Sequence, residues 1–116
     1  MARGILLVLS KPKSPEVDQD YNDWYDNVHL PEILALAGFK SARRFSMSDS
    51  QLASQGGYAS VSTRFPSHYV AVYEVEADDV NTAVQSLTDA GPTLNQGKAF
   101  DYDSALAVFF EEITSR

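Results

Sequence analysis

Residues 21–38 hold the side chains of this sequence that are best suited to chemistry. The imidazole of His29 titrates near neutral pH, so it could take a proton from a substrate or return one. Tyr25 precedes His29 by four residues, and Asp26 precedes it by three, so both would be neighbours of the ring on a helix. The spacing favours His29 as a base, Tyr25 as its partner or as an oxyanion donor, and Asp26 as a group that could orient the ring.

Four further side chains could bind a substrate beside this pair. Tyr21 and Trp24 fall on the same helical face and would give flat apolar walls for an aromatic or polyketide-like compound. Arg43 could hold a carboxylate, phenolate or enolate. Tyr73, on a later strand, could supply a second phenol to the pocket.

The same residue types also fit a helix with a purely structural role. Aromatic residues at helical spacing are typical of a protein core, and neighbouring Arg residues are typical of ion pairs at a surface or interface. A His–Tyr pair can also satisfy its own polar groups. The state of His29 separates these interpretations. A base would titrate near neutral pH and face an open cavity, whereas a structural His would be buried with both nitrogens bonded by protein.

Pro31 lies inside the helical pattern, which extends from about residue 15 to residue 37. Proline has no N–H and clashes with the carbonyl four residues back, here that of Asn27, so we expect a kink or a loosened turn beside His29. Gly38 would end the helix as a left-handed cap.

The remaining elements alternate in a recognisable order. A second helix is predicted from an N-cap at Asp78 to Gly91. Strands are predicted over 4–9, 39–45, 68–76 and 105–113. The order β-α-β-β-α-β predicts a single α+β domain over residues 1–116, with the ferredoxin-like plan of a four-stranded antiparallel sheet and two helices on one face.

The strand patterns also predict which side chains share a face. Strict alternation over 39–45 groups Phe39, Arg43 and Phe45, and we expect this face to meet the helices. Apolar residues fall on both faces of the first and last strands, and the sequence offers no third layer to cover the second face. A homodimer through the sheet faces is therefore expected.

Residues 46–66 are rich in Ser, Gly and Gln, and Gly56-Gly57 marks a turn. A loop of this length without structure of its own is uncommon in a compact domain. It could be a lid over a pocket, an excursion that contacts a partner subunit, or a variable surface insertion.

Composition excludes several other classes. The net charge of −7 argues against nucleic acid and anionic membranes as partners. The absence of Cys excludes disulfides, thiolate metal sites and a Cys nucleophile. His29 and His68 form no metal-binding pair, and no Gly-rich dinucleotide motif is present, so neither a metal nor a cofactor is predicted. The apolar run 5–9 is too short to span a membrane, and no signal-peptide pattern is present, so a cytoplasmic location is expected.

The motif Trp24-Tyr-Asp-x-x-His-x-Pro-Glu-Ile-Leu34, followed by Gly38-Phe-x-Ser-Ala-Arg-Arg-Phe45, resembles the EthD-like family of the dimeric α/β-barrel superfamily. That family carries a Trp/Tyr–Tyr pair, a His and an x-Pro on its first helix, ahead of Gly-Phe and the second strand. The resemblance is specific over residues 21–45, and elsewhere it depends on the order of elements. The segment 46–66 has no counterpart in the family pattern.

The resemblance implies a homodimer that binds a small hydrophobic ligand and performs acid–base chemistry without a bound cofactor. The substrate would be an oxygenated ring or polyketide-like compound, and the reaction a cyclisation, dehydration, lactone isomerisation or cofactor-free oxygenation. Each of these takes a proton from carbon or phenol and holds an enolate-type anion in a dry pocket. Two alternatives stay open. One is a non-catalytic ligand-binding or accessory protein of a catabolic or biosynthetic pathway, and the other is a haem- or oxygen-handling monooxygenase.

Overall fold

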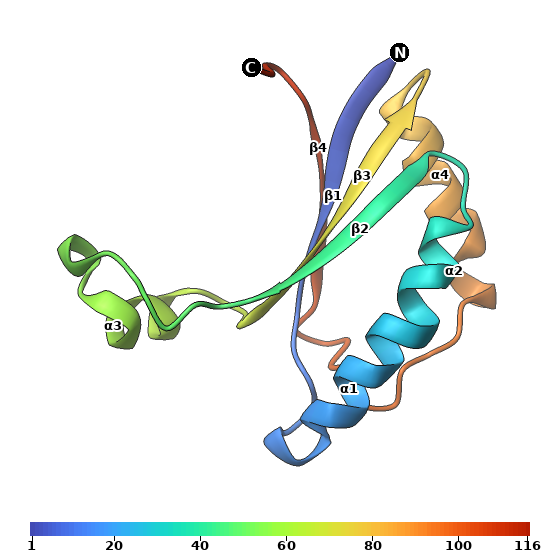
Figure 1. Cartoon of the computed structure of the whole chain (residues 1–116). Coiled ribbons are helices and arrows are strands. Elements are labelled where there is room, and N and C mark those ends of the chain that lie inside the picture. The colour runs from blue at the N-terminus through green and yellow to red at the C-terminus, as the bar shows by residue number, and fades with distance from the viewer.

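The computed structural model describes residues 1–116 and shows a twisted four-stranded sheet with a layer of helices packed on one side and a projecting segment on the other (Figure 1). The strands lie in the order β2-β3-β1-β4, and every neighbouring pair is antiparallel. The predicted α+β architecture is thereby confirmed, and the arrangement is consistent with the ferredoxin-like plan. The strands are β1 (Ala2–Ser10), β2 (Phe39–Ser46), β3 (Tyr69–Ala77) and β4 (Leu106–Glu111).

The helical layer has two parts. Asp79, one residue after the predicted cap, is the N-cap of the second part, and its carboxylate accepts the N–H of Asn81 at 2.8 Å. None of the helices is both long and apolar enough to cross a membrane. The first part comprises η1 (Pro15–Val17), α1 (Asp18–Trp24), η2 (Tyr25–His29) and α2 (Leu30–Leu34), and the second comprises α4 (Val80–Ala90) and η4 (Gly91–Thr93).

Pro31 loosens the first helix as predicted. The turn before it, η2, is π-helical, and the N–H of Leu30 bonds the carbonyl of Tyr25 five residues back. Because Pro31 offers no N–H to the carbonyl of Asn27, the regular α-helical ladder cannot continue here, and the wider turn accommodates the gap. Tyr25 and His29 begin and end this turn, so the irregular backbone presents the candidate catalytic pair.

The helix-facing side of the sheet forms the core. Tyr69, Ala71, Tyr73 and Val75 share this face of β3, and the last three of them are buried. Alternate residues of β1 point the same way, with Leu6 buried at its centre. Tyr73 therefore lies under the first helix, where the sequence placed it.

A β-bulge at the start of β2 changes which arginine faces the helices. The register against β3 shifts just after Phe39, so one extra residue enters the strand. Arg44 then pairs with Ala71 on the helix-facing side, and Arg43 and Phe45 lie on the opposite side. The prediction that Arg43 and Phe45 share a face with Phe39 is wrong, because strict alternation does not survive a bulge.

The other side of the sheet, here called the open face, is covered by no helix of this chain (Figure 1). Phe110, which is 48% exposed, and Leu106, which is 54% exposed, contribute from β4. The predicted apolar character on both faces of β1 and β4 is confirmed. The apolar side chains of the open face, assigned from the strand registers, are Ile5, Leu7, Leu9, Phe45, Val70, Val72, Leu106, Val108 and Phe110.

Residues 47–68, here called the arm, leave the sheet between β2 and β3 and extend away from the helical layer (Figure 1). The arm is not structureless, since it contains η3 (Ala53–Gln55) and α3 (Gly57–Arg64). Gly56 and Gly57 have φ angles of 89° and 70°, a left-handed conformation that glycine adopts readily. The predicted turn is therefore present, and it starts a helix.

Candidate functional site

Six ring-bearing side chains pack together between the first helical part and the sheet. Trp24 stacks on His29, with ring centroids 4.8 Å apart, and Tyr25 meets His29 edge-on at 5.1 Å. We call this group the aromatic cluster. Its members are Tyr21, Trp24, Tyr25, His29, Tyr73 and Phe100.

Four buried polar atoms of the aromatic cluster have no hydrogen-bond partner in the protein. They are Trp24 Nε1, Tyr25 Oη, His29 Nδ1 and Tyr73 Oη. Tyr25 and His29 therefore do not satisfy each other, so the interpretation of a self-satisfied structural pair is wrong. An unpaired buried polar atom costs about 1–3 kcal/mol, and folded proteins contain few of them. Their gathering in one place is typical of a site that hydrogen-bonds something outside the chain.

Burial sets the protonation of these groups. It lowers the pKa of His29 below its ordinary value, while the nearby carboxylate of Glu32 acts weakly in the opposite direction. Burial raises the pKa of Tyr25 to about 12, and burial together with the neighbouring Tyr25 raises the pKa of Tyr73. At neutral pH the cluster therefore holds an uncharged imidazole that can accept a proton and two phenols that keep theirs.

Tyr21 differs from the other two tyrosines of the cluster. Its hydroxyl lies 2.5 Å from that of Ser10 and is hydrogen-bonded to it. This bond uses the polar end of Tyr21 within the protein, and its ring is fully buried. Tyr21 can therefore form a wall of the site. The hydroxyls of Tyr25 and Tyr73 are neighbours that influence each other's pKa, and neither makes a hydrogen bond of good geometry within the protein.

The segment between η4 and β4 covers the cluster. Phe100 lies 6.0 Å from Tyr25 and 5.7 Å from Trp24 by ring centroids, and its ring is buried. Gly97 packs directly on the indole, since a Cβ there would be 2.7 Å from the Trp24 ring. Glu32 ties the segment to α2 by accepting the N–H of Asn95 at 2.9 Å.

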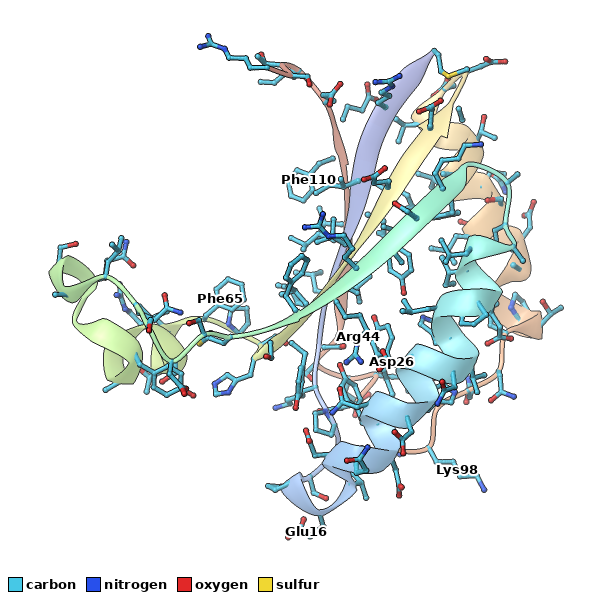
Figure 2. The ribbon with its side chains drawn as sticks, viewed as in Figure 1. Glu16, Asp26, Arg44, Phe65, Lys98 and Phe110 are labelled. Carbon is cyan, nitrogen blue, oxygen red and sulfur yellow. The ribbon has the colours of Figure 1, made fainter.

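A groove of about 400 Å³ opens at the edge of this covering segment. Trp24 is the member of the aromatic cluster that lines it, and Lys98 stands at its outer side (Figure 2). The groove therefore brings solvent to the Trp24 side of the cluster, and His29, Tyr25 and Tyr73 do not line it. Its other lining residues are Val17, Asp20, Asn95, Gln96 and Ala99.

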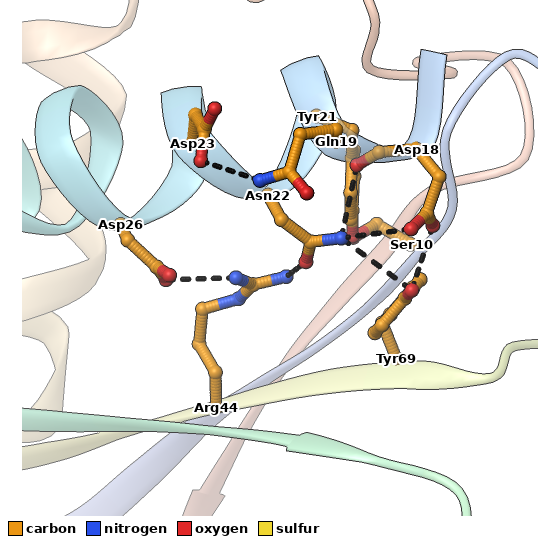
Figure 3. Close-up of polar contacts among 9 residues, drawn as sticks. All are labelled: Ser10, Asp18, Gln19, Tyr21, Asn22, Asp23, Asp26, Arg44 and Tyr69. Atoms are coloured by element: carbon orange, nitrogen blue, oxygen red, sulfur yellow. Dashed lines mark hydrogen bonds and ion pairs between the residues drawn. The ribbon is translucent and has the colours of Figure 1, made fainter. Parts of the chain in front are cut away.

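Arg44 joins the first helix to the sheet in a network that the sequence did not reveal (Figure 3). Its guanidinium donates to Asp26 at 2.7 Å and to Asn22 at 2.8 Å, and it lies 4.3 Å above the Tyr25 ring. The expectation that Asp26 orients His29 is wrong, because its carboxylate bonds Arg44. Only the bulge in β2 brings Arg44 to this position, and no local signal in the sequence marks that bulge.

Arg43 lies outside the site. Its guanidinium is 5.3 Å from the Phe45 ring on the open face of the sheet. It therefore cannot serve as the anion clamp beneath the first helix. The fold brings together the other five predicted site residues, which are Tyr21, Trp24, Tyr25, His29 and Tyr73.

Comparisons with known proteins agree with this fold. No family model and no curated protein matches the chain. A solved structure of an ethyl tert-butyl ether D (EthD) family protein from Bacillus halodurans C-125 matches with a TM-score of 0.52 and 15% identity, over 97% of this chain and 100% of that one. The chain has the fold of that protein. The resemblance seen in the first-helix motif is thereby confirmed at the level of the fold.

Proposed function

We propose that the chain is an EthD-like protein that binds a small hydrophobic, oxygenated ring or polyketide-like compound in the aromatic cluster and acts on it by proton transfer without a bound cofactor. The observation that supports this proposal is the group of unpartnered buried polar atoms, above all those of His29, Tyr25 and Tyr73. A ligand oxygen among them would provide the missing hydrogen bonds.

The protonation states fit the two halves of such a reaction. The neutral His29 would accept a proton from carbon or phenol, because its lowered pKa keeps it uncharged at neutral pH. The hydroxyls of Tyr25 and Tyr73 would donate hydrogen bonds to the resulting enolate or phenolate oxygen. Trp24 and Tyr21 would flank the ring of the compound. Cyclase, dehydratase, isomerase and cofactor-free monooxygenase reactions all share this step.

A non-catalytic ligand-binding or accessory protein is the second candidate. The raised pKa values of Tyr25 and Tyr73 are compatible with it as well, because phenols that keep their protons can donate hydrogen bonds to a ligand oxygen whether or not the ligand reacts. Turnover separates the two candidates. A catalyst converts a bound compound and loses that conversion in His29→Gln, whereas a binding protein leaves every bound compound unchanged.

We also propose that two copies associate through their open faces. Each copy exposes apolar side chains from all four strands there, Phe110 and Leu106 among them, and a second sheet packed on them would form a closed barrel. The aromatic cluster lies on the other side of the sheet, so each copy would keep its own site.

The first experiment is a thermal-shift screen with phenolic, quinone, lactone and polyketide-like compounds. A compound at a hundredfold excess over its Kd stabilises the folded state by about 2.7 kcal/mol. We expect a compound whose shift falls in His29→Ala and in Tyr25→Phe but persists in the matched control His68→Ala, where the His is exposed. Binding that persists unchanged in both cluster variants would place the ligand elsewhere and overturn the proposal. Product analysis on the same compound then tests for turnover.

A further inference from the structure

We propose that the arm is a clasp, which packs against a second copy of this chain and secures the pair formed through the open faces. This inference rests on the dimer of the proposed function. It adds a second contact surface, which is formed by residues 47–68. The family resemblance in the first-helix motif does not imply such a surface.

The arm is ordered by its own hydrogen bonds. At its base, the N–H of Met47 donates to the carbonyl of His68 at 2.8 Å. The buried hydroxyl of Ser67 also donates to the carbonyl of Ser10 in β1, which fixes the arm to the sheet. Near its tip, Arg64 donates to the carbonyl of Gln55 at 2.9 Å and joins the end of α3 to η3. The arm is thus a preformed projection, and a preformed surface loses little conformational entropy on binding.

The arm exposes apolar side chains that its own chain does not cover. Leu52 is 66% exposed, Phe65 44% and Tyr58 37%. The chain has a radius of gyration of 15.4 Å, whereas a compact domain of this length has one of about 13 Å. The arm thus exposes large apolar side chains while Arg64 and part of its backbone are hydrogen-bonded, which is typical of a protein-binding surface.

The arm and the open face lie on the same side of the molecule. In Figure 1 the arm extends on the side of the sheet opposite α2 and α4. Phe65 on the arm and Phe110 on the open face both lie on that side (Figure 2). The two surfaces meet at an angle, so a protein seated on the open face would also contact the arm.

The distribution of charge favours a second copy of this chain as the protein that occupies the open face. Around its apolar centre the open face carries both signs, with Arg3 and Arg43 beside Glu74 and Glu76. A surface of mixed sign can pair with itself across a two-fold axis. The arm holds one acidic and one basic residue, Asp49 and Arg64, in a chain of net charge −7. It would therefore approach a second acidic copy without like-charge repulsion.

The size of the sheet also favours a contribution from the arm. Four strands of six to nine residues give a flat area of about 500 Å². A stable protein pair buries roughly 800 Å² on each partner. The exposed apolar surface of the arm would add to the area buried on both copies at once, because the contact is reciprocal.

Sedimentation velocity over a range of concentrations tests the clasp. We compare the wild-type chain with Leu52→Ser/Tyr58→Ser on the arm and Leu7→Glu on the open face. The matched control is Leu34→Ser, a helix position with the same 37% exposure as Tyr58. We expect the arm variant to raise the dimer Kd by roughly 30-fold, which is the range of interface hot spots, and the control to leave it within about threefold.

Amide hydrogen exchange gives a second readout that needs no variant. Exchange in residues 57–64 should slow as the wild-type chain dimerises, because the partner covers α3. An unchanged Kd in the arm variant, with exchange in α3 independent of concentration, would overturn the clasp and leave the dimer standing. If the wild-type chain is monomeric throughout, the dimer and the clasp both fail. Leu7→Glu should dissociate the pair whether or not the arm contributes, so a pair that survives Leu7→Glu would overturn the dimer through the open faces and the clasp with it.

Discussion

The aromatic cluster and the arm each contain aromatic and apolar side chains, but different groups lack a partner in the two regions. In the cluster four of the six rings are buried and those of Trp24 and His29 are half-buried, and four polar atoms, including those of Tyr25 and His29, have no partner. In the arm the backbone and Arg64 are hydrogen-bonded, while Leu52 and Tyr58 face outward. What each region lacks indicates what it would bind. The cluster lacks polar partners, which a small oxygenated ligand would supply under the proposed function, and the arm lacks apolar cover, which a second copy would supply as a clasp.

The largest expected effect is on stability and separates the two regions directly. Phe100→Ala should lower the free energy of unfolding by about 3–5 kcal/mol, because the ring fills the middle of the cluster and leaves a cavity. Leu52→Ala should change it by less than about 0.5 kcal/mol at concentrations where the chain is monomeric. Urea unfolding measures both. Equal effects would mean that the arm belongs to the core.

Arg43 and Arg44 provide a sharper test of this comparison, because they are the same residue type on opposite faces of β2. Arg44→Ala should cost about 1–3 kcal/mol of unfolding free energy, since it removes the bonds to Asp26 and Asn22 and the contact with the Tyr25 ring. Arg43→Ala should cost less than about 0.5 kcal/mol in the monomer. The reverse order in urea unfolding would show that β2 lacks the bulge.

Removing one hydroxyl at a time compares polar groups within the cluster. Tyr21→Phe should cost about 1 kcal/mol, because it breaks the bond to Ser10 and leaves that hydroxyl buried alone. Tyr25→Phe removes an atom without a partner, so we expect it to be neutral or to stabilise the fold by up to about 1 kcal/mol. Thermal unfolding measures both variants. A clear loss of stability in Tyr25→Phe would mean that its hydroxyl is bonded within the protein.

The smallest effect is a dependence on pH. The folded pKa of His29 lies below its unfolded value of about 6.5, so between the two values the unfolded chain binds a proton that the folded chain does not. The unfolding free energy should therefore fall as the pH drops below about 6.5, and the fall should end at the folded pKa.

His29→Gln should remove this part of the slope, while His68→Gln, at an exposed position, should keep it. The difference between the two variants, measured by urea unfolding from pH 8 to pH 5, cancels the titration of the carboxylates. An identical slope in both variants would mean that solvent reaches His29 freely in the folded chain.

Much of the fold and part of the site followed from the sequence, because the signals are local. Pro31 lacks an N–H wherever the chain places it, so a disturbed turn beside His29 was predictable, and it is present as η2. Gly38 is left-handed as predicted, with a φ of 94°, but it lies in the turn before β2 and does not cap the helix, because α2 already ends at Leu34 with Ala35 as its C-cap. The helical period alone put Tyr25 and His29 on one face.

Tertiary structure decided the rest, because it depends on contacts between segments distant in the sequence. The bulge that brings Arg44 rather than Arg43 to the helices arises from the pairing of β2 with β3. The lowered pKa of His29 requires the burial that packing creates. The direction of the arm depends on where Ser67 is bonded to β1. Residue types and spacing thus determined the elements and the candidate catalytic pair, whereas long-range packing determined which groups stayed without a partner.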